Sequence, residues 1–243
     1  MGSIRVMTYN VGHYNMGLSP FGFPEDVRAE KTANLKTMLM DTGPDIIGLQ
    51  EDSEYADQAK TIKSSKSLYS PVWKYRPSNG ASNIRAKYSA YAGTGSTGVF
   101  STGAKYRKVV LKVDGKRMLV FSLHATAHTG NSDKRMQEYT ELFELVNREV
   151  WDYAVLCGDF NTLQKADKAN LKAVCKANKF SMAIGSYLPW IDTFYGRTET
   201  SKHHSFDNVL ASPGLTIRTV RVLGEWWSRL YSDHLPVICE IVW

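Results

Sequence analysis

The chain has 243 residues, of which 43% are hydrophobic and 22% are charged, with a net charge of +6. These values are typical of globular proteins and exclude a disordered chain, and no apolar run approaches the ~18 residues that a membrane span needs. Three cysteines without clustered spacing argue against a disulfide framework or a cysteine metal site. The sequence enters an apolar strand almost at once and shows no secretory segment, so we expect a cytoplasmic protein.

The first part of the chain is predicted to alternate strands and helices. Residues 4–9 alternate apolar and polar side chains, which predicts a strand, and 25–41 carry a helical pattern that Gly43-Pro44 ends. Residues 45–50 form a short apolar run typical of a buried strand, and a second helix is expected at 54–66. The Gly- and Ser-rich segment 76–98 is predicted to be a long surface loop.

Strands dominate the remainder of the predicted structure. They are expected at 97–101, 105–113, 117–123, 153–157, 205–210, 216–223 and 237–242. Asp114-Gly115 predicts a hairpin between the second and third of these, and helices are expected at 132–150 and 166–178. The order fits two sheets packed face to face with helices outside, and residues 1–243 show no linker that would divide them into two domains.

Polar side chains recur where the predicted strands end. Such residues are common in turns, so each one alone indicates little. Together, however, they supply the oxygen ligands, bases and hydrogen-bond donors that metal-assisted hydrolysis of a phosphate ester requires. The set comprises Asn10, Glu51, His124, Asp159, Asn161, Asp207, Asp233 and His234.

These motifs, in this order, resemble the endonuclease/exonuclease/phosphatase superfamily. The matching pieces are Thr8-Tyr9-Asn10, Leu49-Gln50-Glu51, the segment 95–101, Ser122-Leu123-His124, Gly158-Asp159-Phe160-Asn161, Phe206-Asp207-Asn208 and Ser232-Asp233-His234. They span residues 8–234. The resemblance implies a four-layered α/β/β/α sandwich of two mainly antiparallel sheets, flanked by helices, with one active site at the edge of the sheets.

The resemblance also implies a role for each residue. Glu51 is expected to be the main ligand of a divalent cation, Mg²⁺ or Mn²⁺, with Asn10 and Asp233 beside it, since carboxylate and amide oxygens suit such ions. Among the catalytic residues, His234 would act as general base or contact the phosphate, with Asp207 orienting its ring.

Three further catalytic assignments follow from the same resemblance. Asp159 and Asn161 would position the nucleophile and hold a phosphoryl oxygen. His124 would protonate the leaving oxygen, although His128 competes with it for this role. The motif Phe206-Asp207-Asn208 departs from the usual Ile-Asp-Tyr or Tyr-Asp-Phe, but it keeps the carboxylate.

The substrate is predicted from a basic stretch rather than from the motifs. Residues 60–117 hold thirteen Lys and Arg against one acidic residue, Asp114, interleaved with aromatic rings. Cations and rings together favour a nucleic-acid surface, although a solvated face that promotes solubility has the same composition. Five side chains are predicted to bind substrate: Arg85, Lys87, Tyr88, His128 and Arg135. A helix-surface salt bridge is an equal alternative for Arg135.

The sequence therefore predicts a monomeric, metal-dependent phosphodiesterase that acts as an endonuclease on nucleic acid, with DNA favoured. The alternative is a lipid or inositol-phosphate enzyme, similar to the sphingomyelinases. It is motivated by Trp226-Trp227, which would contact a lipid surface if exposed but would otherwise pack in the core. A non-catalytic binding module is disfavoured because the main catalytic residues are present.

Overall fold

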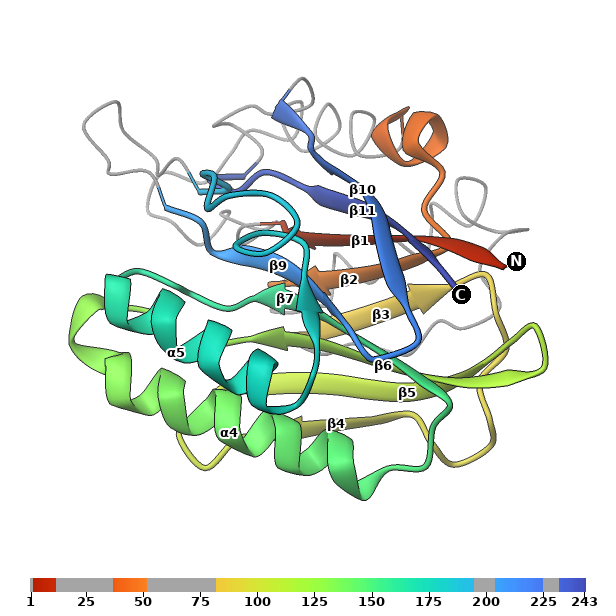
Figure 1. Cartoon of the computed structure of the whole chain (residues 1–243), viewed down its shortest axis with the longest axis horizontal. Coiled ribbons are helices and arrows are strands. Elements are labelled where there is room, and N and C mark those ends of the chain that lie inside the picture. Colours follow the sequence, from red (N-terminus) through yellow and green to blue (C-terminus); the bar gives the residue numbers. More distant parts are fainter. Residues whose placement is uncertain (1, 12–36, 52–81, 195–203, 225–231) are drawn as a thin grey trace, which may run out of the picture.

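The structure is a computed structural model (Figure 1). It describes residues 2–11, 37–51, 82–194, 204–224 and 232–243. Two twisted sheets of five and six strands pack face to face. The predicted helix at 54–66 and the tryptophan pair 226–227 lie outside the described residues. None of the described helices is long and apolar enough to cross a membrane.

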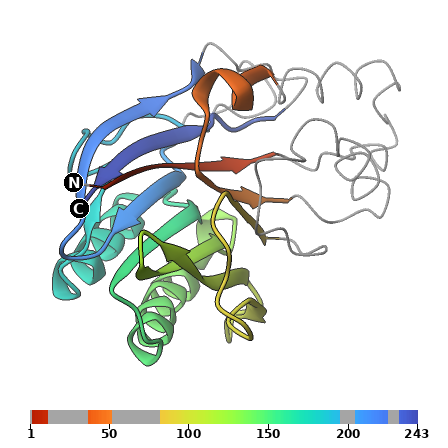
Figure 2. The same cartoon turned by 90° about the vertical axis from the view of Figure 1, so that its right-hand side faces the viewer.

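The five-stranded sheet has the order β10-β11-β1-β2-β3. Its strands are β1 (Ser3–Asn10), β2 (Ile46–Gln50), β3 (Ser82–Ala86), β10 (Thr216–Val222) and β11 (Val237–Val242). β1 and β2 are parallel, and the other neighbours are antiparallel. The first and last strands of the chain thus lie side by side, as Figure 2 also shows.

The six-stranded sheet has the order β4-β5-β6-β7-β9-β8. Its strands are β4 (Ser96–Val99), β5 (Lys105–Val113), β6 (Lys116–His124), β7 (Tyr153–Asp159), β8 (Ser181–Met182) and β9 (Asp207–Ala211). β6 and β7 form its one parallel pair. Asp114 and Gly115 join β5 to β6 with φ values of 48° and 76°, which is the left-handed backbone that a tight hairpin requires.

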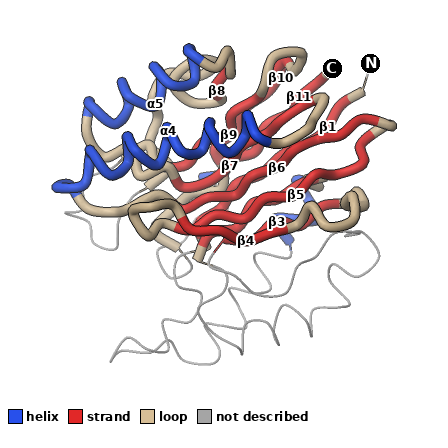
Figure 3. Tube along the Cα trace, turned by 90° about the horizontal axis from the view of Figure 1, so that it is seen from below, coloured by secondary structure: helices blue, strands red, loops and turns tan. Residues whose placement is uncertain are grey.

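Helices cover the outer face of the six-stranded sheet (Figure 3). They are α4 (Ser132–Arg148), preceded by the 3₁₀ turn η2 (Thr129–Asn131), and α5 (Lys165–Ala177). Leu142 and Phe143 of α4 pack with Phe121 and Leu156 of the sheet in one buried cluster. On the other side of the molecule, helical residues 37–42 bring Met38 onto the outer face of the five-stranded sheet. The predicted order of layers, helix, sheet, sheet and helix, is confirmed.

The predicted loop at 76–98 is wrong for part of its length. Residues 82–86 form β3, because Ser82, Ile84 and Ala86 alternate on a face that is buried against the other sheet. β4 at 96–99 overlaps the strand that was predicted at 97–101. The sequence of β3 contains small polar residues, so it lacks the alternation of apolar residues from which a strand is predicted.

The two sheets approach each other closely at Gly48 of β2. A methyl group added there would lie 2.4 Å from Sγ of Cys157 in β7 and 3.1 Å from Oγ of Ser122 in β6. Cys157 is fully buried in the core between the sheets. Glycine at this position therefore sets the distance between the sheets close to the ends of β2, β6 and β7.

A buried ion pair fixes α4 to α5 and to the segment that follows β6. Arg135 is fully buried, and its Nη2 donates to Oδ2 of Asp167 at 2.8 Å. Its Nη1 donates to the carbonyls of Thr126 and His128 at 3.1 and 2.8 Å. Asp167 also accepts from Oγ of Ser132 at 2.6 Å. The guanidinium thus holds the segment that begins directly after His124.

We expect Gly48→Ala to lower the free energy of unfolding by about 1–3 kcal/mol, because the new methyl group overpacks the space between the sheets. Urea unfolding followed by circular dichroism measures this. Gly130→Ala is the matched control, since no atom lies within 4 Å of the added methyl group there. Equal free energies of unfolding for the two variants would show that the sheets can move slightly apart without a loss of stability.

We expect Arg135→Met to lower the free energy of unfolding by roughly 3–5 kcal/mol, because the buried carboxylate of Asp167 loses its cation. Arg148→Met on the same helix is the control: its pair with Glu144, at 3.5 Å, is largely exposed, and we expect a loss under ~1 kcal/mol. Losses of similar size in the two variants would contradict a structural role for Arg135.

Candidate functional site

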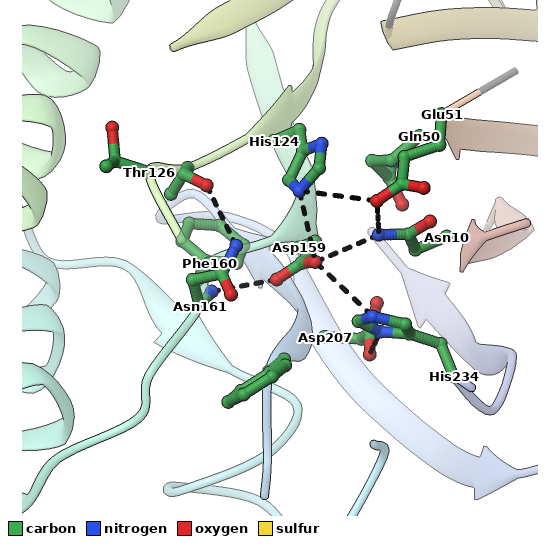
Figure 4. Close-up of polar contacts among 12 residues, drawn as sticks. Asn10, Gln50, Glu51, His124, Thr126, Asp159, Phe160, Asn161, Asp207 and His234 are labelled. Carbon is green, nitrogen blue, oxygen red and sulfur yellow. Dashed lines mark hydrogen bonds and ion pairs between the residues drawn. The ribbon is translucent and has the colours of Figure 1, made fainter. Parts of the chain in front are cut away.

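The polar side chains predicted from the sequence meet at one edge of the two sheets (Figure 4). The parallel strands β1 and β2 end at Asn10 and Gln50, and the parallel strands β6 and β7 end at His124 and Asp159. β9 and β11 run antiparallel to these pairs, so Asp207 and the residues before Val237 begin at the same edge. The directions of the strands therefore bring the motifs together at this edge of the sheets.

Asp159 lies at the centre of the cluster and accepts contacts from both sheets. Its side chain is 1% exposed, and its Oδ2 accepts from Nδ2 of Asn10 at 3.0 Å. The same Asn10 nitrogen donates to Oε1 of Glu51 at 3.2 Å. Glu51 has a φ of 56°, which is unusual for a residue other than glycine and indicates backbone strain at this point.

Two histidines approach Asp159 through the same type of ring atom. Nε2 of His124 lies 3.5 Å from Oδ2 of Asp159 and 3.8 Å from Oε1 of Glu51. Nε2 of His234 lies 3.6 Å from the same Asp159 oxygen and 4.0 Å from Oδ1 of Asp233. The carboxylate is thus flanked by two imidazoles, of which His124 is a quarter exposed and His234 is buried.

His234 is oriented by Asp207, as the sequence predicts. Nδ1 of His234 and Oδ2 of Asp207 are 2.8 Å apart, and Oγ1 of Thr193 donates to the same oxygen at 2.8 Å. Burial alone would lower the pKa of His234, but the carboxylates of Asp207 and Asp159 raise it to about 10. Burial raises the pKa of Asp207 to about 6, with the imidazole opposing the shift. The two carboxylates therefore favour the imidazolium form of His234.

Asn161 is held in place from both of its sides. Its backbone N–H donates to Oδ1 of Asp159 at 2.8 Å, and its Nδ2 donates to the carbonyl of Ala125 at 2.8 Å. Its φ of 49° lies in the left-handed region, which asparagine tolerates better than most residues. Asn161 thereby links the ends of β6 and β7.

Asn208, at the departure from the family motif, has a structural role. Its Oδ1 accepts from the backbone N–H of Ile184 at 3.0 Å, and its Nδ2 donates to the carbonyl of Ile184 at 2.8 Å. The asparagine therefore fastens β9 to a neighbouring loop.

Five hydroxyl and amide side chains that the sequence did not single out complete the site. Gln50 joins the sheets, accepting from Thr8 at 3.2 Å and donating to Ser122 at 3.0 Å. Ser232 donates to the carbonyl of Asn10 at 2.7 Å and accepts from the N–H of His234 at 3.0 Å. Gln50 and Ser232 lie inside the quoted motifs, whereas Thr193 has no sequence signal.

Three of the predicted substrate-binding residues lie at the wrong end of the sheet. β3 runs antiparallel to β2, so Ser82 pairs with Gln50 at the site, while Ala86 pairs with Ile46. Lys87 binds Asp45 at 2.8 Å, and Tyr88 is half-buried beyond it. Lys87 and Tyr88 are about 17–20 Å along the chain from the end of β2, and Arg85, which pairs with Ile47, is about 10 Å away. Arg85, Lys87 and Tyr88 therefore do not belong to the cluster at the strand ends, and their binding of substrate stays a prediction.

The other two predicted substrate ligands also differ from expectation. Arg135 is fully buried and paired with Asp167, so its predicted contact with substrate is wrong. The alternative, a salt bridge, is present, but it lies in the protein interior instead of on the helix surface. His128 is exposed and has a φ of 74°, and its carbonyl accepts from Arg135. Of the two competing histidines, His124 is the one beside Asp159 and Glu51.

The donor set fits a hard cation. Glu51 and Asp159 both point at a single N–H donor, Nδ2 of Asn10, at the place where a cation would balance their charge. Ligand atoms of Asp159, Asp207 and His234 also lie within 4.8 Å of one another. Asp207 and His234 are already bonded to each other, so the oxygens of Glu51 and Asp159 are the more available donors in the cluster.

Solved structures with the same fold belong to proteins with different substrates. D. rerio TDP2, complexed with a single-strand DNA product, matches with a TM-score of 0.73 and 13% identity over 100% of both chains. Sphingomyelinase C from Streptomyces griseocarneus matches with a TM-score of 0.71 and 17% identity over 99% of both chains. The human Nocturnin catalytic domain with a bound sulfate has a TM-score of 0.68 and 17% identity, over 99% of this chain and 94% of that one.

A comparison with curated protein sequences found no significant match. The model of the Endonuclease/Exonuclease/phosphatase family, in contrast, matches residues 7–234, which include every motif gathered at the sheet edge. The chain therefore belongs to the endonuclease/exonuclease/phosphatase family, whose members are hydrolases that act on phosphoester bonds.

Proposed function

We propose that the protein is a divalent-metal-dependent phosphodiesterase that cleaves nucleic acid, with DNA favoured and with endonuclease-like action. The observation that carries this proposal is the Asp159 carboxylate, flanked by Nε2 of His124 and Nε2 of His234 at 3.5 and 3.6 Å. Two imidazoles on either side of one carboxylate supply the groups that an in-line displacement at phosphorus requires.

Glu51, with Asn10 and Asp233 as the predicted further ligands and Asp159 adjacent, would hold Mg²⁺ or Mn²⁺. When bound, such an ion neutralises charge that develops on the phosphoryl oxygens. Glu51 is suited to this because its side chain remains 16% exposed, while that of Asp159 is almost completely buried.

Asp159 and His234 act on the attacking water and on the phosphoryl group. The imidazolium of His234 donates its Nε2–H to a phosphoryl oxygen, and Asp207 keeps the ring charged and correctly oriented. Oδ2 of Asp159 accepts a hydrogen bond from the water and aligns it, while the N–H of Asn161 fixes Oδ1. This favours the phosphate-contacting role of His234 over its alternative role as general base.

His124 acts on the leaving oxygen. Its ring lies on the other side of Asp159 from His234 and is the more exposed of the two, so it can reach the departing side of a bound phosphodiester. A protonated Nε2 would donate to the leaving oxygen as the bond to phosphorus breaks.

The preference for nucleic acid is supported by the basic character of the chain and by the DNA complex of the TDP2 neighbour. Sphingomyelinase C shares the fold to a similar degree, so the fold alone does not separate the two substrate classes. A panel of plasmid, oligonucleotide, sphingomyelin and inositol phosphate, each with Mg²⁺, Mn²⁺ or a chelator, separates them. Cleavage confined to the lipid or to the inositol phosphate would overturn the nucleic-acid assignment.

We expect Glu51→Gln and His234→Asn each to lower plasmid nicking by at least ~10²-fold, and a chelator to abolish it, because charge at the phosphoryl oxygens is no longer balanced. Nicking rates on agarose gels measure this, and thermal melting checks that the variants fold. Glu141→Gln is the control, since Glu141 lies on α4 and bonds Ser101 instead of the site. Undiminished nicking by either site variant would remove the mechanism.

We expect His124→Ala to slow cleavage of an ordinary DNA phosphodiester by about 10²–10⁴-fold, because the alkoxide leaving group needs a proton. The loss should be much smaller for bis(p-nitrophenyl) phosphate, whose leaving group departs readily without an acid. His128→Ala serves as the matched control and should retain activity on both substrates. An equal loss on the two substrates would refute the acid role of His124.

A further inference from the structure

The described cations of the basic stretch divide into two groups according to which end of the sheets they occupy. Lys87 lies at the end away from the site, bound to Asp45. Lys112 and Arg117 lie near the β5–β6 hairpin, over the ring of Tyr91 at 4.8 and 5.4 Å. Lys116 is exposed at the same hairpin. These charges contribute little at the active centre beyond a long-range field.

Nearer to the site, two of the cations have assigned partners. Lys108 points to the helix-covered face of the six-stranded sheet, where it pairs with Glu149. Arg107 is 6% exposed, and its Nε donates to the carbonyl of Ser82 at 3.2 Å. Neither side chain presents a free charge to a ligand in this arrangement.

Lys105 differs from both in its position and its exposure. It is the first residue of β5 and pairs across the sheet with His124, the last residue of β6. Directly paired residues project from the same face of a sheet, with Cβ atoms about 4.5–5.5 Å apart. The inward face of β5 is marked by Val109, Leu111 and Val113, which belong to the core between the sheets and share the alternation of Lys105.

The side chain of Lys105 is exposed, and in the part of the chain that the structure describes its ammonium has no carboxylate within 4.0 Å. It therefore stands next to the proposed acid, His124, on the side toward β4 and away from His234. A substrate strand that leaves the centre past His124 would reach this position next.

We propose that Lys105 binds a backbone phosphate on the leaving-group side of the scissile bond and so selects polymeric substrates over single phosphodiesters. This inference rests on the proposed function. The compact ammonium on its flexible stem suits a sequence-independent phosphate contact, and such contacts position a nucleic acid without reading its bases. The chemical class recognised is a polyanion with a phosphodiester repeat.

The test measures kcat/KM as a function of NaCl concentration, at fixed Mg²⁺, on a single-stranded oligonucleotide and on bis(p-nitrophenyl) phosphate. Lys105→Ala, Lys105→Arg and Lys116→Ala are compared with the natural protein. Lys116→Ala is the matched control, because it removes the same charge at a position about 27 Å from Lys105 along the β5–β6 hairpin.

For the oligonucleotide, we expect Lys105→Ala to lower kcat/KM and to reduce the slope of log kcat/KM against log salt by about 0.7, the value for one lost phosphate contact on a single strand. Lys105→Arg should recover most of kcat/KM and most of the salt slope. The loss of kcat/KM caused by Lys105→Ala should be smaller on bis(p-nitrophenyl) phosphate. Thermal melting should match for all variants, since Lys105 is exposed.

Two outcomes overturn the inference, and they are distinguishable. If the natural protein cleaves the oligonucleotide but Lys105→Ala and Lys116→Ala have the same salt slope, the assignment of Lys105 fails while the proposed function stands. If the natural protein cleaves bis(p-nitrophenyl) phosphate but no nucleic acid, the proposed substrate fails, and the role of Lys105 fails with it.

Discussion

The arrangement of the site depends on one buried carboxylate, Asp159, that accepts contacts from both sheets. Asn10 reaches it from the five-stranded sheet, and the backbone of Asn161 fixes its second oxygen. A charge with 1% exposure is stable only if it is fully partnered, so the surrounding donors and imidazoles are constrained to stay close to it. In the proposed reaction, the same requirement keeps these groups in place before the cation or the phosphate binds.

This carboxylate can be shared only because the sheets approach each other closely at the strand ends. Gly48 allows the approach, and the Thr8–Gln50–Ser122 chain of hydrogen bonds ties the two sheets together directly beneath the site. The core farther along the strands is apolar and has no such polar links among the residues described. The packing of the sheets and the chemistry of the site therefore have the same structural origin.

Local patterns predicted most of the strands, the helices α4 and α5 and the polar residues at the strand ends, because each depends on residues close together in sequence. Placement along a strand was not predictable in this way: Arg85, Lys87 and Tyr88 were assigned to substrate, yet β3 runs antiparallel to β2 and carries them away from the site. The burial of Arg135 depends on its pairing with Asp167, which lies 32 residues away in the sequence. Thr193 likewise reaches Asp207 only through the fold.

A charge count over a stretch of sequence is therefore a weak guide to substrate, because a strand distributes its residues between two faces and along its whole length. Of the cations described between 82 and 117, most are paired, stacked on a ring or remote from the carboxylates. A protein complexed with a DNA product and a sphingomyelinase both have this fold, so the fold does not distinguish the substrates. We proposed Lys105 as a source of specificity because the strand next to His124 places it just outside the cluster.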